Sequence, residues 1–145
     1  MPKISFYNAD IKLSFPEKAA LKKFIPLIFL QEKKQLNSLS IIFCSDAYLL
    51  TLNKEYLQHD YYTDIITFDL SSGAKIDGEV YISIDRIKEN SVLHNVSFPE
   101  ELLRIIFHGT LHLCGYGDKT SFEKQEMTNK EDKCIEQYLT FHVKQ

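Results

Sequence analysis

Residues 97–113 constrain the fold more than any other stretch, because they combine clear helix signals with a surface that is apolar nearly all round. Ser97 is a good helix N-cap, Pro99 suits the first turn, and Glu100 can complete a capping box. The apolar positions that follow surround the helix axis: Leu102, Leu103, Ile105, Ile106, Phe107, Leu111 and Leu113. A helix that is hydrophobic all round is a buried helix. The pattern therefore predicts a central helix with the rest of the domain packed around it.

Polar residues lie on one stripe of this helix, which predicts a shared cleft. Arg104, His108 and His112 follow one another at intervals of four residues. Positions i and i+4 lie one above the other on a helix that turns about 100° per residue. Two imidazoles so placed can bind one metal ion with little rearrangement. One packed and one solvated histidine is the alternative that this spacing alone leaves open.

A third metal ligand has to come from beyond the helix. Asp118 is six positions after His112, and a continued helix would point it away from the pair. Gly115 and Gly117 can adopt the left-handed conformations that end a helix and reverse the chain. We expect this bend to return the Asp118 carboxylate to the imidazoles and complete a site of two histidines and one carboxylate.

The residue after the first histidine argues against one class of metal enzyme. Zinc peptidases with this histidine spacing carry a glutamate there as general base, whereas this chain has Gly109. Peptide hydrolysis by that mechanism is disfavoured, while metal binding is not. A non-haem iron(II) oxygenase site of two histidines and one carboxylate remains an alternative. So does a structural metal, although structural zinc sites usually close with four protein ligands.

Size and composition indicate one folded domain without a linker or an internal repeat. The 145 residues are 44% hydrophobic and 26% charged, as in ordinary globular proteins. No apolar run reaches the length of a membrane span, and residues 1–4 do not begin a secretory signal. A cytoplasmic location without a membrane partner is therefore expected. Reduced thiols are expected at the three cysteines, Cys44, Cys114 and Cys134.

Apolar periodicity elsewhere alternates between the two-residue repeat of strands and the longer repeat of helices. Strands are expected near residues 3–7, 39–44, in the second half of 59–69, and 79–84. Helices are expected over residues 16–30, 45–56, from about 85, and 122–141. Pro26 should kink or break the first of these. We predict one α+β domain over residues 1–145, with about four strands in a mixed sheet and about five helices, of which the metal-binding helix is central and buried.

The stretch 108–118 resembles the signature of the YbeY endoribonuclease family, which reads His-Gly-x-Leu-His-Leu-x-Gly-Tyr-Asp-His. Residues 108–116 match each fixed position, and the final Asp-His pair of the family is Gly117-Asp118 here. By this resemblance, the third metal-ligand position carries aspartate in place of histidine. Aspartate still offers a zinc ligand, but it adds a negative charge and a harder donor, so metal identity is less determined than metal binding.

Further blocks extend the resemblance over roughly residues 36–139. The similar blocks are residues 52–56 with 63–68 (Leu-Asn-x-x-Tyr and Thr-Asp-Val-Leu-Ser-Phe in the family), residues 78–83 (Gly-Asp-Ile-x-Ile-Ser), and Glu126, Met127 and Glu131 of its last helix. In the family, an arginine implicated in activity commonly follows the tyrosine of the first block, and this chain has Leu57 there. His59 is a candidate to replace part of its role, and an ordinary polar loop histidine is the alternative.

The resemblance implies a metal-dependent endoribonuclease that cleaves single-stranded RNA during ribosomal RNA maturation, with ribosomal RNA and the ribosome as partners. It implies one divalent metal, with zinc as the expected ion, held by His108, His112 and Asp118. A metal-bound water would then attack the phosphodiester or activate a 2′-hydroxyl that attacks it. A metal-dependent hydrolase of another substrate and a non-catalytic ribosome-associated module are the remaining alternatives.

A net charge of −3 means that the chain cannot rely on overall charge to bind RNA and needs a local contact surface. Arg104 is a candidate phosphate clamp, and an ion pair with Glu100 is the alternative. Tyr116, like Tyr61 and Tyr62, is a candidate to stack on unpaired bases, unless these rings are half-buried core. A candidate basic patch, or simply a solvated face, is formed by Lys22, Lys23, Lys33 and Lys34.

Overall fold

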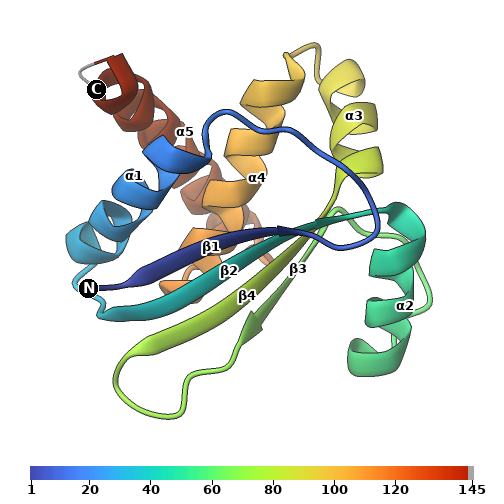
Figure 1. Cartoon of the computed structure of the whole chain (residues 1–145), viewed down its shortest axis with the longest axis horizontal. Helices are drawn as coiled ribbons and strands as arrows, with labels where there is room; N and C mark the ends of the chain where they lie inside the picture. The colour runs from blue at the N-terminus through green and yellow to red at the C-terminus, as the bar shows by residue number, and fades with distance from the viewer. Residues whose placement is uncertain (144–145) are drawn as a thin grey trace.

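A computed structural model describes residues 1–143 as four strands and five helices (Figure 1). In chain order the elements are β1 (Lys3–Asn8), α1 (Lys18–Gln31), β2 (Leu36–Cys44), α2 (Asp46–Leu57), β3 (Ile65–Asp69), β4 (Ile76–Ser83), α3 (Ile84–Leu93), α4 (Phe98–Leu113) and α5 (Ser121–Val143). The predicted α+β fold with a mixed sheet is confirmed. The predicted domain also covers residues 144 and 145, which lie outside the described residues.

The sheet has the strand order β1-β2-β4-β3, in which β3 is an edge strand. Strands β1, β2 and β4 run parallel to one another, and β3 runs antiparallel to β4. Within the described residues, only β4 pairs with β3, so the other edge of β3 remains open. Helix α4 contacts both β3 and β4. The open edge of β3 therefore borders the helix that carries the histidine pair.

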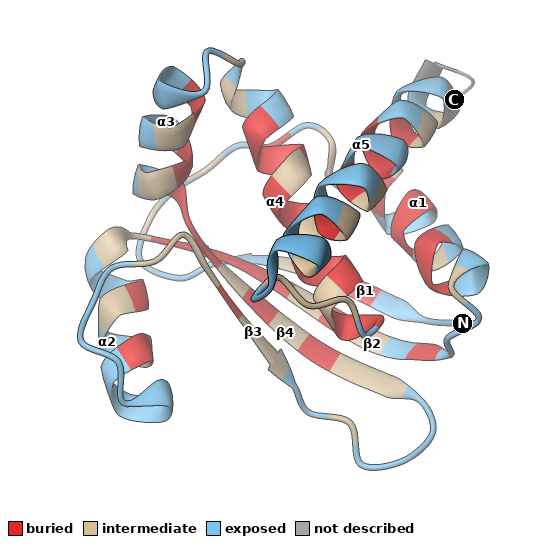
Figure 2. Cartoon of the chain, turned by 180° about the vertical axis from the view of Figure 1, so that it is seen from behind, coloured by how far each residue is buried: buried red, intermediate tan, exposed pale blue. Residues whose placement is uncertain are grey.

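Two cores hold the layers together. Helices α1, α4 and α5 cover one face of the sheet, and α2 lies at the other (Figures 1 and 2). Leu39, Ile41 and Phe43 of β2 point into the main core beneath the three helices. Cys44 belongs with Leu49 of α2 to a smaller core on the opposite face. Neighbouring strand residues thus point to opposite faces, as the two-residue repeat of a strand requires.

Helix α4 begins at a serine cap and packs closely against the sheet at Gly109. The hydroxyl oxygen of Ser97 accepts a hydrogen bond from the N–H of Glu100 at 3.2 Å, which confirms the predicted N-cap. A Cβ atom at Gly109 would lie 2.9 Å from Cγ1 of Val80 and 3.0 Å from Cδ1 of Ile65. Only glycine fits there, so the position that holds a glutamate base in zinc peptidases faces the sheet and has no room for a side chain.

Helix α1 runs from Lys18 to Gln31 without a break at Pro26, so a break there is wrong, and the kink given as the other outcome stays a prediction. Proline removes one backbone hydrogen bond from a helix interior. Buried side chains on both sides of the proline, Phe24, Ile25, Ile28 and Phe29, anchor α1 to the core and maintain the helix across it.

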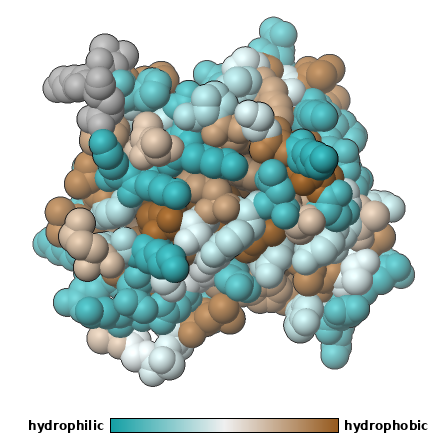
Figure 3. Space-filling view, in the orientation of Figure 1, coloured by the Kyte–Doolittle hydropathy of each residue, from teal (hydrophilic) through white to brown (hydrophobic). Residues whose placement is uncertain are grey.

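The surface of the molecule shows no large apolar face in the view of Figure 3, where hydrophilic side chains cover most of the area and hydrophobic ones are scattered among them. Within residues 1–143, no helix is both long and apolar enough to cross a membrane.

Candidate metal centre and adjoining groove

The chain reverses immediately after α4, as predicted. Gly115 has a φ of +109°, and its N–H donates to the carbonyl oxygen of His112 at 3.0 Å, while the N–H of Tyr116 donates to that of Leu111 at 3.1 Å. These bonds satisfy carbonyl groups that the helix end would leave without partners. The reversal carries Asp118 back alongside the last turn of α4.

Gly117 has a different role from the predicted one. Among the glycines of the described residues, only Gly115 has a positive φ. A Cβ atom at Gly117 would lie 2.5 Å from Oε2 of Glu123, so this glycine provides space. Oε1 of Glu123 accepts the N–H of Thr120 at 3.0 Å, and the hydroxyl of Thr120 accepts the N–H of Glu123 at 3.1 Å. This capping box begins α5 and fixes the loop that carries Asp118.

His108, His112 and Asp118 converge on one point. Oδ2 of Asp118 lies 3.2 Å from Nε2 of His108 and 3.3 Å from Nε2 of His112. One ligand atom from each residue lies within 4.8 Å of the other two, so the group could hold a metal ion. The side chains of His108 and His112 are 17% and 26% exposed and that of Asp118 is 42% exposed, so the site opens to solvent on the aspartate side.

Hydrogen bonds to the far side of each ring aim both Nε2 atoms at Asp118. Nδ1 of His112 lies 2.8 Å from the carbonyl oxygen of Tyr116, and Nδ1 of His108 lies 2.6 Å from Oε2 of Glu131. A carbonyl can only accept, so Nδ1 of His112 carries the proton and its Nε2 offers a lone pair. Glu131 is buried and also accepts from Nη1 of Arg104 at 3.0 Å, so it is held as an acceptor for His108 in the same way.

The donor set fits a divalent cation. In their neutral forms, both rings direct a lone pair at a carboxylate oxygen, and three acceptors that meet without a donor between them attract a positive ion. Two imidazoles and a carboxylate are ligands that zinc and other first-row metals take in proteins. Burial lowers the pKa of His108, but its bond to Glu131 and the charges of Glu131, Asp118 and Asp64 outweigh burial, so this pKa lies above its ordinary value. The site therefore already favours positive charge.

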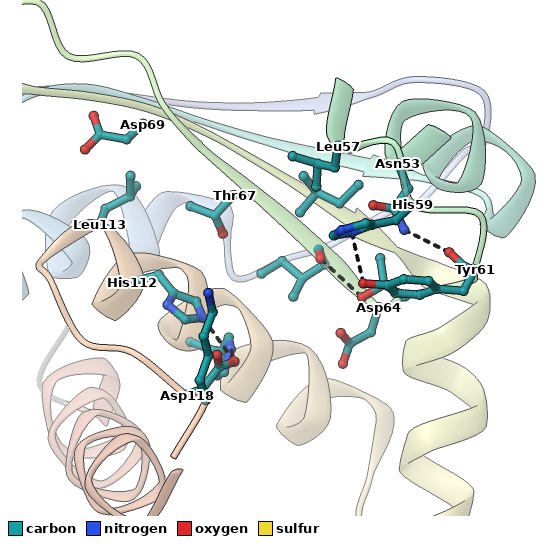
Figure 4. A pocket seen from close by; sticks show the side chains of 15 residues that line it. Asn53, Leu57, His59, Tyr61, Asp64, Thr67, Asp69, His112, Leu113 and Asp118 are labelled. Carbon is teal, nitrogen blue, oxygen red and sulfur yellow. Dashed lines mark hydrogen bonds and ion pairs between the residues drawn. The ribbon is translucent and has the colours of Figure 1, made fainter. Parts of the chain in front are cut away.

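Asp64 is a site residue that the sequence did not single out. It precedes β3 and lines the cavities on both sides of His108, and its side chain points into the cavity (Figure 4). Burial raises its pKa, as does the charge of Glu101, against the opposite effect of His108. Its position in residues 63–68 could have pointed to it, because this block carries part of the family resemblance. The resemblance was stated without a role for this aspartate.

A cavity of about 590 Å³ lies beside the convergent residues. Its walls are the histidine face of α4, the open edge of β3 and the loop between α2 and β3 (Figure 4). A buried residue of α2, Asn53, anchors this loop: its side-chain amide donates a hydrogen bond to the carbonyl oxygen of Tyr61 at 2.8 Å. The rings of His59 and Tyr61 stack at 5.1 Å and line the cavity together with Leu57, the residue at the position of the family arginine.

The other residues predicted to bind RNA have partners within the protein. Arg104 forms ion pairs with Glu131 at 3.0 Å and Asp132 at 2.7 Å, where an ion pair with Glu100 was the predicted alternative. It lines a second cavity, of about 420 Å³, on the far side of His108. The hydroxyl of Tyr116 donates to Glu32 at 2.6 Å, and Tyr116 is not among the residues that line the larger cavity. RNA contacts by Arg104, His59 and Tyr116 stay predictions.

The comparisons with known proteins agree with this geometry. The family model described as "Endoribonuclease YbeY" matches residues 3–139. The chain belongs to the YbeY endoribonuclease family. A relative named "Endoribonuclease YbeY" from Cytophaga hutchinsonii is 46% identical over 130 residues, which is 89% of this chain and 91% of the relative. Another of that name, from Flavobacterium psychrophilum, is 42% identical and covers 96% of this chain and 97% of its own length.

A solved structure has the same fold. The solution structure of TM1509 from Thermotoga maritima superposes with a TM-score of 0.63 at 26% identity, over 93% of this chain and 88% of that one. Membership of the YbeY family supports an endoribonuclease role for this chain, and an endoribonuclease has an RNA substrate.

Proposed function

We propose that this chain is a metal-dependent endoribonuclease that cleaves single-stranded RNA in the maturation of ribosomal RNA, using one divalent metal held by His108, His112 and Asp118. The observation that carries the proposal is the pair of Nδ1 hydrogen bonds that aims both Nε2 atoms at Oδ2 of Asp118. Zinc is the expected ion. A cytoplasmic location and association with the ribosome stay predictions that follow from the same family.

The metal ion and the side chains have different roles in the proposed cleavage. When bound, a divalent ion supplies Lewis acidity, which stabilises charge on phosphoryl oxygens and lowers the pKa of water. His108, His112 and Asp118 hold it, and Glu131 keeps the His108 ring in its orientation. Asp64 is the carboxylate placed to exchange a proton with the attacking oxygen, because it points into the same cavity and its pKa lies above the usual range of aspartate.

The form of the cavity supports a single-stranded substrate. A pocket of about 590 Å³ is in the size range of small-molecule sites. Proteins that read RNA bases do so mainly in loops and ends, where unpaired bases can turn outward and stack on aromatic side chains. The exposed rings of His59 and Tyr61 offer such a stacking surface at the wall opposite the histidine pair.

The test combines metal content with cleavage in the same preparations. Wild type, His108→Ala, His112→Ala and a control, His142→Ala, are loaded with zinc or manganese, dialysed, analysed for metal and incubated with a structured RNA that has single-stranded ends. His142 pairs with Glu17, on the helix end away from the site, and its substitution should change neither readout. We expect His108→Ala and His112→Ala to lose both metal and cleavage. Full cleavage by metal-free His112→Ala would contradict the proposal.

The same assay separates the alternatives. A protein that retains one metal per chain and cleaves no RNA would be a binding module with a structural metal. Cleavage of a peptide is disfavoured by the packing at Gly109, where the general base of zinc peptidases has no room. A matched peptide or ester substrate in the same experiment tests the other hydrolases.

A further inference from the structure

A second hollow continues the groove beyond the metal centre. A cavity of about 510 Å³ adjoins the first at Asp69 and Leu113, which line both. Three segments form it: the turn after α1 with Lys33 and Lys34, the loop between β3 and β4, and the end of α4 at Leu113 to Gly115. A strand that occupies the first cavity can therefore extend toward the two lysines.

A Schellman-type end of α1 fixes the backbone of the two lysines. The N–H of Lys33 donates to the carbonyl oxygen of Leu30 at 3.1 Å, and that of Lys34 to Phe29 at 2.9 Å. Lys33 has a φ of +59°, in the left-handed region that is usually taken by glycine at this point of a helix end. A residue with a Cβ is strained in this conformation, which Gln58 and Asn95 also adopt beyond the ends of α2 and α3. The turn fixes the backbone from which both lysine side chains reach the cavity wall.

Both lysines have charges that the described part of the chain leaves without a carboxylate partner. Neither forms an ion pair with a carboxylate of residues 1–143. Arg104, by contrast, is bound by two carboxylates on the other side of the centre. Asp69 is the acidic neighbour in the lysine cavity, and its carboxylate accepts the N–H of Ser71 at 3.0 Å within its own loop. The cavity on that side also has Lys124 in its wall, but its lining includes four carboxylates, those of Asp64, Glu101, Asp118 and Glu131. The lysine cavity has two lysines against one carboxylate, so of the two ways out of the metal centre it is the one that favours an anion.

We propose that Lys33 and Lys34 bind backbone phosphates of the RNA strand that flanks the cleaved bond. This site rests on the proposed function, because it extends the same groove. An ammonium group acts on a phosphate as a point charge and reads no base. The site therefore sets the path of the strand and strengthens binding in a way that salt weakens and sequence does not change.

The experiment compares two double variants that remove the same charge from α1 and its end. Lys33→Gln/Lys34→Gln is compared with Lys22→Gln/Lys23→Gln, whose lysines are exposed on α1 and do not line the cavity. The probe is a 2′-O-methyl RNA oligomer, which binds without being cleaved, and its affinity for the zinc-loaded chain is measured by fluorescence anisotropy at several salt concentrations. Each lost phosphate contact lowers the salt slope by about 0.7 for a single strand.

We expect the slope of Lys33→Gln/Lys34→Gln to fall by about 1.4, so that wild type loses about sevenfold more affinity than this variant between 50 and 200 mM salt. The control should follow wild type. Equal slopes for wild type and Lys33→Gln/Lys34→Gln, or equal losses in the two double variants, would overturn the site. Lys33→Gly is a second test. It should fold at least as stably as wild type, since glycine accepts the left-handed conformation. Its salt slope should fall by about half as much as that of Lys33→Gln/Lys34→Gln, because one charge is removed instead of two.

Failure of this site and failure of the proposed function give different results. Cleavage of RNA by wild type with an unchanged slope in Lys33→Gln/Lys34→Gln removes the lysine site and leaves the nuclease. Lysine-dependent binding by a wild type that cleaves no RNA under any metal removes the nuclease and leaves a nucleic-acid binding site.

Discussion

The two walls of the main cavity differ in how their polar groups are held. On the α4 wall, each ring nitrogen has a partner: Nδ1 of His108 bonds to buried Glu131, and that of His112 to a backbone carbonyl. On the loop wall, His59 and Tyr61 are exposed and contact each other through ring stacking and a hydrogen bond of 2.9 Å between the Tyr61 hydroxyl and Nδ1 of His59. The first wall is built to fix a few atoms in one geometry, and the second to present ring faces. Substitutions on the first should affect stability and metal binding, and those on the second should affect RNA binding alone.

The largest effect is expected at Glu131, which supports the α4 wall. Its replacement by alanine leaves Nδ1 of His108 and one nitrogen of Arg104 without their buried partner, at a cost of about 3–5 kcal/mol in unfolding free energy. Glu131→Gln keeps the size of the side chain and should lower zinc affinity about 10- to 100-fold. Urea denaturation and calorimetric titration with zinc measure the two effects.

Asp132→Asn is the matched control for Glu131. Asp132 pairs with the same Arg104, but it is 58% exposed and does not contact His108. We expect its substitution to change unfolding free energy by less than about 1 kcal/mol and to leave zinc affinity unchanged. Zinc affinity of Glu131→Gln equal to wild type would mean that the orientation of His108 does not depend on this bond, and the contrast between the two walls would lose its basis.

Local rules predicted the parts of the site that lie close together in sequence. The histidine pair follows from helix periodicity, and the return of Asp118 follows from a glycine that can end a helix, which the structure confirms at Gly115. Gly117 was wrongly assigned a backbone role, because its neighbour Glu123 comes close only through the cap of α5. A capping box spans a few residues, but which glycine it crowds depends on how the loop is folded.

Residues from distant segments could not be predicted to join the site. Glu131 reaches His108 because α5 packs on α4, and Asp64 reaches it because β3 lies beside α4. The sequence contains no spacing rule for either contact. Arg104 illustrates the same limit: the helix rule offered Glu100 one turn away, and the structure supplies Glu131 and Asp132 from another helix.

A smaller effect is expected at Tyr116, which lies behind the α4 wall. Burial raises the pKa of Glu32, but the bonds from Tyr116 and Lys130 outweigh it and hold this pKa below its usual range. A lowered pKa in the folded state stabilises the protein above the pKa of the unfolded glutamate, and this contribution is lost as the pH falls through the folded pKa. Tyr116→Phe should therefore cost about 1.5–3 kcal/mol at pH 7 and less in acid.

Tyr116→Phe also separates the structural role from the predicted RNA contact. The variant keeps the ring that would stack on a base and loses only the hydroxyl group, so RNA affinity should be unchanged. Tyr7→Phe, at an exposed tyrosine of β1, is the control and should change neither quantity. Denaturation curves recorded across the acid range measure the effect. A cost for Tyr116→Phe that is independent of pH would show that Glu32 is not its partner.

The smallest effect on stability is expected at His59, on the loop wall. His59 is exposed, and its hydrogen bond with the Tyr61 hydroxyl is exposed as well, so His59→Ala should change the unfolding free energy by less than about 0.5 kcal/mol. If the paired rings stack on a base, the same variant loses about 1–3 kcal/mol of RNA binding. His142→Ala, at a histidine of α5 that does not line the cavity, is the matched control. RNA affinity of His59→Ala equal to that of His142→Ala would mean that His59 is an ordinary polar loop histidine. Recognition would then depend on the metal centre and the two lysines.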